Sequence, residues 1–300
     1  MGEVETYELS KVYRGGVRAL DGITLALSGR GPHIVASPNG AGKTTLLRIL
    51  YTAFLPTSGR AYVLGYDVAK DAKSLRKLIA VVPQETRPEP YLTPRQFVEL
   101  YLIARGFSRA DAVGQSRYAL EVMGLDSVKD GPSLTLSSGE RKRVLIAAAL
   151  AANSEVMFLD EPTEGLDPVG RARVYEELRR ITRRGTMVIM TTRHLDEAEE
   201  AANNVVLINR GRLVAVGDPD KLLSSVAYYR YKVVVRGVAR GLVERLRGLG
   251  VGAIERVDGN VVIYVDQRDL KEVLGVLSEA APTFVVEKVS LDDVFRIVFG

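Results

Sequence analysis

The chain contains no cysteine and only two histidines among its 300 residues. Without cysteine it has no disulfide framework, no thiolate metal site and no thiol nucleophile. Long apolar runs are also missing: the longest, residues 144–152, covers about half of a membrane span, so we expect no segment to cross a bilayer. The acidic residues 1–5 lack the apolar stretch of a secretory signal. These absences favour a cytosolic protein.

The chain also has almost no excess of positive over negative residues. Lys and Arg total 41 against 37 for Asp and Glu, which gives a net charge of +4. We interpret this balance as a solvated surface of mixed charge and expect no nucleic-acid partner. Apolar residues make up 46% of the chain, enough to bury a substantial core in one large domain or two modest ones.

Short apolar strands alternate with helical segments through most of the chain. Strand-like runs occur at residues 33–36, 156–159 and 187–190, each next to a segment of helical periodicity. This alternation predicts an α/β fold whose mostly parallel sheet is covered on both faces. Residues 86–152 favour a helical subdomain, in which Thr93 and Gln96 have the spacing of a capping box.

The composition changes after Ser224, where we place a domain boundary. Strand and helix patterns in residues 225–300 follow the order βαββαβ, which is typical of a ferredoxin-like α+β unit. An Asp-Gly-Asn turn at residues 258–260 would join its middle strands. We therefore predict one domain over residues 1–224 and an accessory domain over residues 225–300.

A glycine-rich loop lies between an apolar strand and a helix, which is the context of a phosphate-binding loop. Its glycines let successive N–H groups point at phosphate oxygens, and the positive end of the following helix faces the same anion. Lys43 can reach the β- and γ-phosphates, and the Thr44 hydroxyl can ligate Mg²⁺. Ser37 stands where the strict pattern has its first glycine. The residues expected to bind ATP here are Ser37, Pro38, Asn39, Gly40, Ala41, Gly42, Lys43, Thr44 and Thr45.

Two carboxylates follow the apolar run at residues 156–159. A strand there would deliver Asp160 and Glu161 to its carboxyl end, where open α/β sheets bind ligands. Asp160 suits Mg²⁺, directly or through water. Glu161 suits the attacking water as a general base.

Residues 136–143, Leu-Ser-Ser-Gly-Glu-Arg-Lys-Arg, resemble the L-S-G-G-Q signature of the ATP-binding cassette (ABC) family. Gln84 resembles the glutamine of its Q-loop, and residues 164–167 resemble its D-loop. Tyr13 lies where the family stacks an aromatic ring on adenine. These motifs occur in the family's order across about residues 3–220, so the chain is identified as a member of the family, a phosphate-loop NTPase.

The resemblance implies that two nucleotide-binding domains close head to tail over two ATP molecules. The signature helix of one subunit would then bind the γ-phosphate held by the other. Gln84 would contact Mg²⁺, with Thr44 and Asp160, and couple the site to a membrane partner. The cofactor-binding residues that this arrangement adds are Tyr13, Ser137, Ser138, Gly139, Glu140 and Asp167.

Residues 191–198, Thr-Thr-Arg-His-Leu-Asp-Glu-Ala, are similar to the family's T-T-H-Y-L-D-E-A switch. Without a gap, the switch histidine falls on Arg193, which could bind the γ-phosphate through a charge-assisted hydrogen bond. A shift of one residue would instead bring His194 into the site. Both residues stay candidates at this point.

Residues 288–295 resemble the P-S-L-E-D-V-F ending of the drug-resistance-like group of ABC-2 exporters. This implies an ATPase subunit on the inner face of the membrane that drives export through a transmembrane permease on a separate chain. The permease would dock near residues 91–103. The alternatives are a soluble ABC ATPase not coupled to transport and a partner subunit with weakened catalysis. Lys43, Asp160 and Glu161 argue against the second, whereas Arg193 in the place of the switch histidine keeps it open.

Overall fold

The computed structural model describes residues 3–29, 31–225, 229–236, 242–249, 251, 253–257, 260–280 and 283–299. The chain forms two units, Met1–Asp218 and Pro219–Gly300. A boundary after Ser224, as expected from the sequence, would leave almost all of helix α8 (Pro219–Ser225) in the first unit. The structure groups α8 with the second unit, where it contacts α11 (Leu291–Phe299).

A six-stranded sheet forms the centre of the first unit, in the order β10-β9-β3-β8-β7-β6. Its neighbouring strands pair in parallel, except that β10 is antiparallel to β9. The prediction of a mostly parallel sheet is therefore confirmed. The strands are β3 (Pro32–Ala36), β6 (Ile79–Val82), β7 (Val156–Asp160), β8 (Met187–Thr192), β9 (Asn204–Asn209) and β10 (Arg212–Gly217).

A second, antiparallel sheet has the strand order β2-β1-β4-β5. The sequence predicted no strand at β4, because its first residues are Ser, Gly and Arg and give no apolar alternation. Pairing with β1 along one edge stabilises β4 in the tertiary structure. The strands are β1 (Val4–Val12), β2 (Arg18–Leu27), β4 (Ser58–Val63) and β5 (Tyr66–Asp67).

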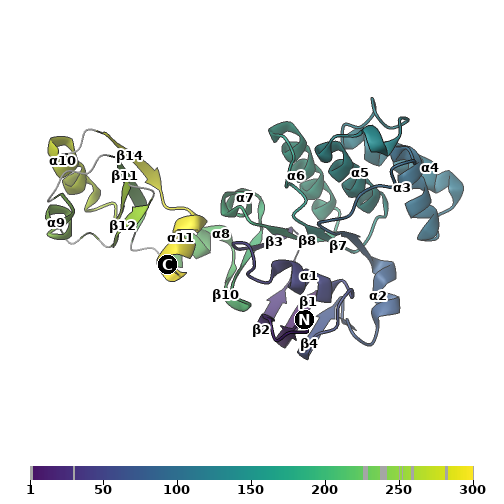
Figure 1. Ribbon diagram of the computed structural model, residues 1–300, viewed down its shortest axis with the longest axis horizontal. Helices are drawn as coiled ribbons and strands as arrows, with labels where there is room; N and C mark the ends of the chain where they lie inside the picture. The colour runs from purple at the N-terminus through teal and green to yellow at the C-terminus, as the bar shows by residue number, and fades with distance from the viewer. Residues whose placement is uncertain are drawn as a thin grey trace. The chain divides into compact units, whose positions relative to one another are not determined.

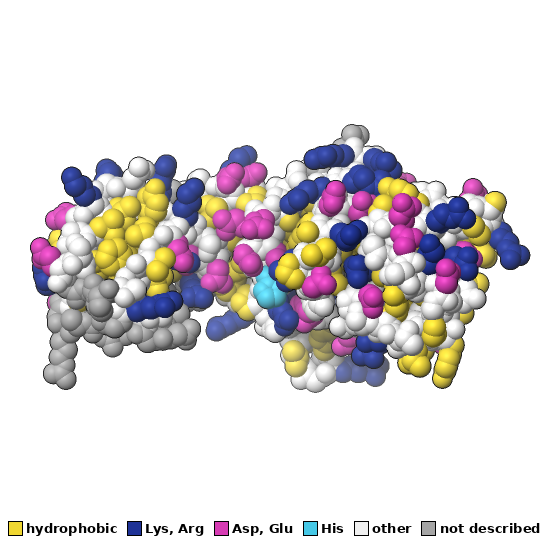
Figure 2. Space-filling model, turned by 90° about the horizontal axis from the view of Figure 1, so that it is seen from above, with side chains coloured by type: hydrophobic (Ala, Val, Ile, Leu, Met, Phe, Trp, Pro, Cys, Tyr) yellow, Lys and Arg dark blue, Asp and Glu magenta, His cyan; other side chains and the backbone are white. Residues whose placement is uncertain are grey.

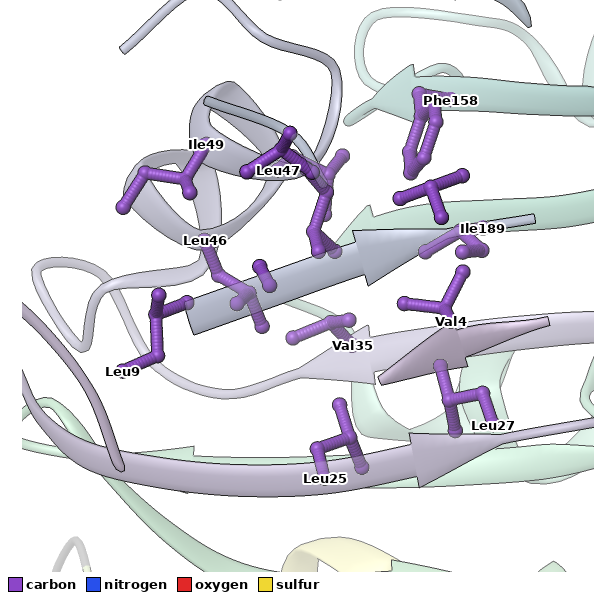
Figure 3. Packing of buried hydrophobic residues seen from close by; sticks show 14 of the residues in the cluster. Val4, Leu9, Leu25, Leu27, Val35, Leu46, Leu47, Ile49, Phe158 and Ile189 are labelled. Atoms are coloured by element: carbon purple, nitrogen blue, oxygen red, sulfur yellow. The ribbon is translucent and has the colours of Figure 1, made fainter. Parts of the chain in front are cut away.

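Helix α1 (Lys43–Leu50) packs between the two sheets (Figure 3). Its side chains Leu46 and Leu47 are fully buried, in one cluster with Val35 of β3, Leu25 of β2 and Phe158 of β7. Burying a leucine side chain contributes about 1.5–3 kcal/mol. The helix is therefore fixed firmly behind the end of β3, which holds the glycine-rich loop between two buried elements.

Three further helices, α3 (Pro94–Ala104), α4 (Arg109–Val122) and α5 (Ser138–Ala151), pack on one another to form the predicted helical subdomain (Figure 1). The capping box is present: the Thr93 hydroxyl accepts from Gln96 N, and Thr93 N donates to the Gln96 side chain. The remaining helices of this unit are α2 (Ala72–Leu78), the 3₁₀ turn η1 (Ser133–Thr135), α6 (Pro168–Arg183) and α7 (Leu195–Ala201).

The second unit contains a four-stranded antiparallel sheet in the order β12-β13-β11-β14. With one helix after β11 and one after β13, this is the predicted ferredoxin-like βαββαβ arrangement (Figure 1). The expected turn residues Asp258 and Gly259 lie outside the described residues. The elements are β11 (Tyr231–Arg236), α9 (Leu242–Arg247), β12 (Ala253–Val257), β13 (Asn260–Val265), α10 (Leu270–Ala280) and β14 (Thr283–Lys288).

The surface carries charges of both signs. On the face shown in Figure 2, the dark blue basic and magenta acidic side chains are interspersed. Within the described ranges, none of the helices combines the length and the apolarity that crossing a bilayer requires.

Candidate active site

The glycine-rich loop connects β3 to α1 with a conformation that requires glycine at its end. Gly42 has φ 110°, and a Cβ there would lie 2.5 Å from the carbonyl oxygen of Ala19. Lys43 is only 5% exposed, and its Nζ donates to the carbonyl oxygens of Ser37 at 2.6 Å and Pro38 at 3.1 Å. Burial lowers the pKa of Lys43, and the carboxylates of Glu161 and Asp160 oppose that shift. The loop thus holds a buried ammonium group ready for an anion.

A cavity of about 340 Å³ opens above this loop. Gln84, Glu161 and Arg193 complete its wall, although they lie far apart in the sequence. The volume falls within the range of small-molecule sites. His194 is exposed and does not line the cavity. The lining residues are Ala19, Asn39, Gly40, Ala41, Gly42, Lys43, Thr44, Thr45, Gln84, Glu161 and Arg193.

Asp160 ends β7 with one carboxylate oxygen fully engaged and the other free. Its Oδ1 accepts from Thr44 Oγ1 at 3.1 Å and from Thr191 Oγ1 at 2.6 Å. Its Oδ2 is buried and has no hydrogen-bond partner among the residues that the structure describes. A magnesium ion is usually held by one or two carboxylates together with substrate phosphates, so this unpaired oxygen beside Thr44 fits such an ion. The sequence analysis predicted no site role for Thr191, although it recognised the switch motif to which this residue belongs.

Glu161 has a left-handed backbone conformation, with φ 48°. Strain of this kind concentrates at functional sites. Thr191 Oγ1 accepts from its backbone N–H at 2.9 Å, and Gln84 Nε2 donates to its Oε2 at 3.0 Å. Burial, together with the neighbouring Glu164, raises the pKa of Glu161 to about 7. A carboxylate with this pKa is suited to accept a proton near neutral pH.

Arg193 forms an ion pair with Glu164, a residue of the D-loop to which the sequence analysis assigned no role of its own. Its Nη2 donates to Oε1 of Glu164 at 2.7 Å. The other oxygen of Glu164 lies 3.4 Å from Gln84 Nε2. A hydrogen bond with Glu161 lowers the pKa of Glu164, and Arg193 acts in the same direction. Glu164 therefore carries a charge next to the cavity wall.

Glu197 of α7 joins several parts of the site, and the sequence analysis missed it. The residue is only 5% exposed. Oε2 accepts from the hydroxyls of Thr163 at 2.8 Å, Tyr175 at 3.0 Å and Thr192 at 3.2 Å. Oε1 lies 2.9 Å from Arg171. This one side chain thus links the segment after β7 and the end of β8 to α6.

The signature residues lie apart from the cavity of their own chain. Ser137 caps α5 in a capping box with Glu140. Ser137 and Ser138 are exposed, and none of these residues lines the cavity. A Cβ on Gly139 would lie 3.5 Å from the carbonyl oxygen of Gly165. The start of α5 therefore adjoins the D-loop, at a surface that another subunit can reach.

Two other predicted residues have structural contacts. The Asp167 side chain accepts from Gly170 N at 2.6 Å and so caps α6. The Tyr13 hydroxyl lies 3.0 Å from Thr45 Oγ1, and its ring packs edge-on against Phe54. Tyr13 is beside the cavity but not among its lining residues.

Comparison with known proteins gives the same family. The ABC transporter family profile matches residues 20–164. The daunorubicin/doxorubicin resistance ATP-binding protein DrrA of Streptomyces peucetius is 32% identical, over 99% of this chain and 92% of the relative. The daunorubicin resistance ATP-binding protein DrrA3 of Streptomyces coeruleorubidus is 36% identical, over 95% of this chain and 92% of the relative. This chain belongs to the ATP-binding subunits of ABC transporters.

A solved structure supports the assignment. The ATP-binding cassette MJ0796, in a dimeric post-hydrolysis state bound to ADP and Pi, matches with a TM-score of 0.66 and 25% identity. The match covers 72% of this chain and 98% of that one. The predictions of an ABC-type phosphate-loop fold and of ATP hydrolysis coupled to transport are confirmed. The contacts that individual residues of this subunit make with the nucleotide stay predictions.

Proposed function

We propose that this subunit hydrolyses MgATP at the cavity above the glycine-rich loop and so energises export through a separate permease. The observation that carries the proposal is that the buried Lys43 and Glu161 line one cavity, while Asp160, with its unpaired Oδ2, contacts Thr44 of the cavity wall. Each has a distinct task in phosphoryl transfer to water.

Each group acts through its own atoms. Lys43 Nζ exchanges its two loop carbonyls for oxygens of the β- and γ-phosphates. Asp160 and Thr44 would hold a magnesium ion, which would neutralise phosphate charge when bound. Glu161 takes the proton of the attacking water, and Gln84 fixes the orientation of its carboxylate. Arg193 donates to the γ-phosphate.

A second copy, or a related subunit, completes the site. Ser137 is exposed and does not line the cavity of its own chain, and with the start of α5 it suits the γ-phosphate of a partner subunit. The dimeric state of the ADP-bound relative supports this arrangement. A lone chain should therefore hydrolyse ATP slowly.

The permease would bind on the helical subdomain, with the subunit on the inner face of the membrane. Tyr91, Leu100 and Ile103 are 83%, 50% and 44% exposed there, so this subdomain offers apolar side chains to a partner. The two relatives that match almost the whole chain are named for resistance to a drug. Their names support export, with a drug as the substrate class.

The substitution Glu161→Gln tests the proposed chemistry. It removes the base but keeps the side chain's shape and its contact with Gln84. We expect turnover to fall by about 10²-fold or more, while ATP binding persists and a nucleotide-bound dimer accumulates. Steady-state phosphate release and size-exclusion chromatography with ATP measure both effects.

A control substitution for this test is Glu176→Gln, which makes the same change on the exposed side of α6. It should leave turnover within about twofold of the unchanged protein, as surface substitutions do. Unchanged turnover in Glu161→Gln would mean that another group is the base.

A further inference from the structure

Glu164 lies outside the cavity but contacts two residues of its wall. Its Oε1 accepts from Arg193 at 2.7 Å, and its Oε2 lies 3.4 Å from Gln84 Nε2. Both members of the Arg193–Glu164 pair are partly exposed, at 40% and 35% of their side-chain surface. The pair is therefore solvated enough to open without leaving a buried charge unpaired.

The charge on Arg193 explains why a carboxylate stands beside it. A guanidinium is always charged, whereas a histidine at this position of the switch could be neutral at physiological pH. Without a counter-charge, Arg193 would lie beside the buried Lys43, and each cation disfavours the other. Glu164 supplies a counter-charge as the ion-pair partner of Arg193, and Glu161 also faces both cations.

The same pair competes with the nucleotide for Arg193. A γ-phosphate carries more negative charge than a carboxylate and offers more acceptor oxygens, so it is the stronger partner for a guanidinium. If Arg193 Nη2 turns to the γ-phosphate, it gives up its contact with Glu164. ADP has no γ-phosphate, so it leaves the pair intact.

We propose that Glu164 is a positioning residue that holds Arg193 off the γ-phosphate position until ATP arrives, and that it thereby sets the affinity for ATP relative to ADP. This inference presupposes the γ-phosphate contact of Arg193 proposed above.

The test compares the full-length protein with its Glu164→Gln variant, which keeps the side chain's size and removes its charge. Calorimetry measures the affinity for ADP and for the non-hydrolysable β,γ-imido analogue of ATP. We expect the analogue to bind about two- to fivefold more tightly, the range of a partly exposed ion pair, and ADP to bind as before. Glu164→Ala should show the same selective gain, and Glu176→Gln should show none.

Repeating the comparison in a protein that carries Arg193→Ala isolates the contribution of the Arg193–Glu164 ion pair. There, Glu164→Gln should change the affinity for the analogue by less than about 1.5-fold, because no ion pair remains to be broken. An equal gain in both backgrounds would show that Glu164 only repels the phosphate at long range, and would overturn the inference. An equal gain for ADP, or no gain at all, would overturn it too.

The same measurements distinguish a failure of the proposed function from a failure of this inference. If the unchanged protein binds neither nucleotide, the ATP site itself is wrong. If it binds both and Glu164→Gln leaves their ratio unchanged, only the role of Glu164 is wrong.

Discussion

At the scale of single residues, the site depends on polar atoms that are buried before any nucleotide is present. Lys43 is held by two loop carbonyls, and Asp160 keeps one oxygen without a partner. Leaving a buried acceptor unpaired costs roughly 1–3 kcal/mol. The fold bears this cost where a cation and phosphates are to bind, so the site is organised in advance of its ligand.

Alanine substitutions at Arg193 and at His194 should have different effects on ATP turnover. Arg193 lines the cavity and His194 does not. Arg193→Ala should therefore lower ATP turnover by about tenfold to a hundredfold, as expected for the loss of a hydrogen bond to a charged group. His194→Ala should stay within about twofold. Phosphate-release assays on both variants decide the matter, and the reverse pattern would favour His194 as the γ-phosphate group.

At the scale of secondary structure elements, the site is set by which strand and helix ends meet. β3, β7 and β8 are neighbours in the parallel sheet, so the loop, the acidic pair and the switch all follow carboxyl ends at one edge. Helix α7 ties this edge to α6 through Glu197, whose carboxylate accepts from three hydroxyl groups. The packing of α7 therefore affects both the base and the switch.

The substitution Glu197→Gln tests this connection. It replaces a buried charged acceptor with an amide that cannot satisfy all three hydroxyls and Arg171 at once. We expect the free energy of unfolding to fall by about 2 kcal/mol in urea denaturation. Glu200→Gln, on the exposed side of the same helix, should change it by less than about 0.5 kcal/mol. Equal effects of the two variants would contradict a special role for Glu197.

At the scale of the whole molecule, the chain separates nucleotide chemistry from its C-terminal unit. Every residue that lines the ATP cavity belongs to Met1–Asp218. The second unit has its own core, which includes Val233, Leu246 and Ile263. Two cores of this kind can fold independently.

A chain that ends at Asp218 should therefore remain folded and bind ATP. We expect a single cooperative urea transition and a nucleotide affinity within about threefold of the full chain. Circular dichroism during denaturation and calorimetry with ATP measure both properties. Aggregation of the shortened chain would show that the units need one another.

The sequence by itself determined the family, the α/β fold and the principal ATP-site motifs. Local chemistry explains this success: glycines with positive φ, a lysine after them and carboxylates after an apolar run are needed at fixed spacings along the chain. The ferredoxin-like order of the C-terminal unit followed from alternation of short strands and helices in the same way. Such features are encoded by neighbouring residues and can be recognised without any long-range contact.

Only the tertiary structure decided how distant residues combine. It placed Arg193 rather than His194 at the cavity, paired Arg193 with Glu164, and gathered three hydroxyls around Glu197. It also added β4 to the antiparallel sheet and assigned α8 to the second unit. Each of these depends on contacts between segments far apart in the chain. Their geometry is fixed by sheet pairing and core packing, which no local pattern of residues specifies.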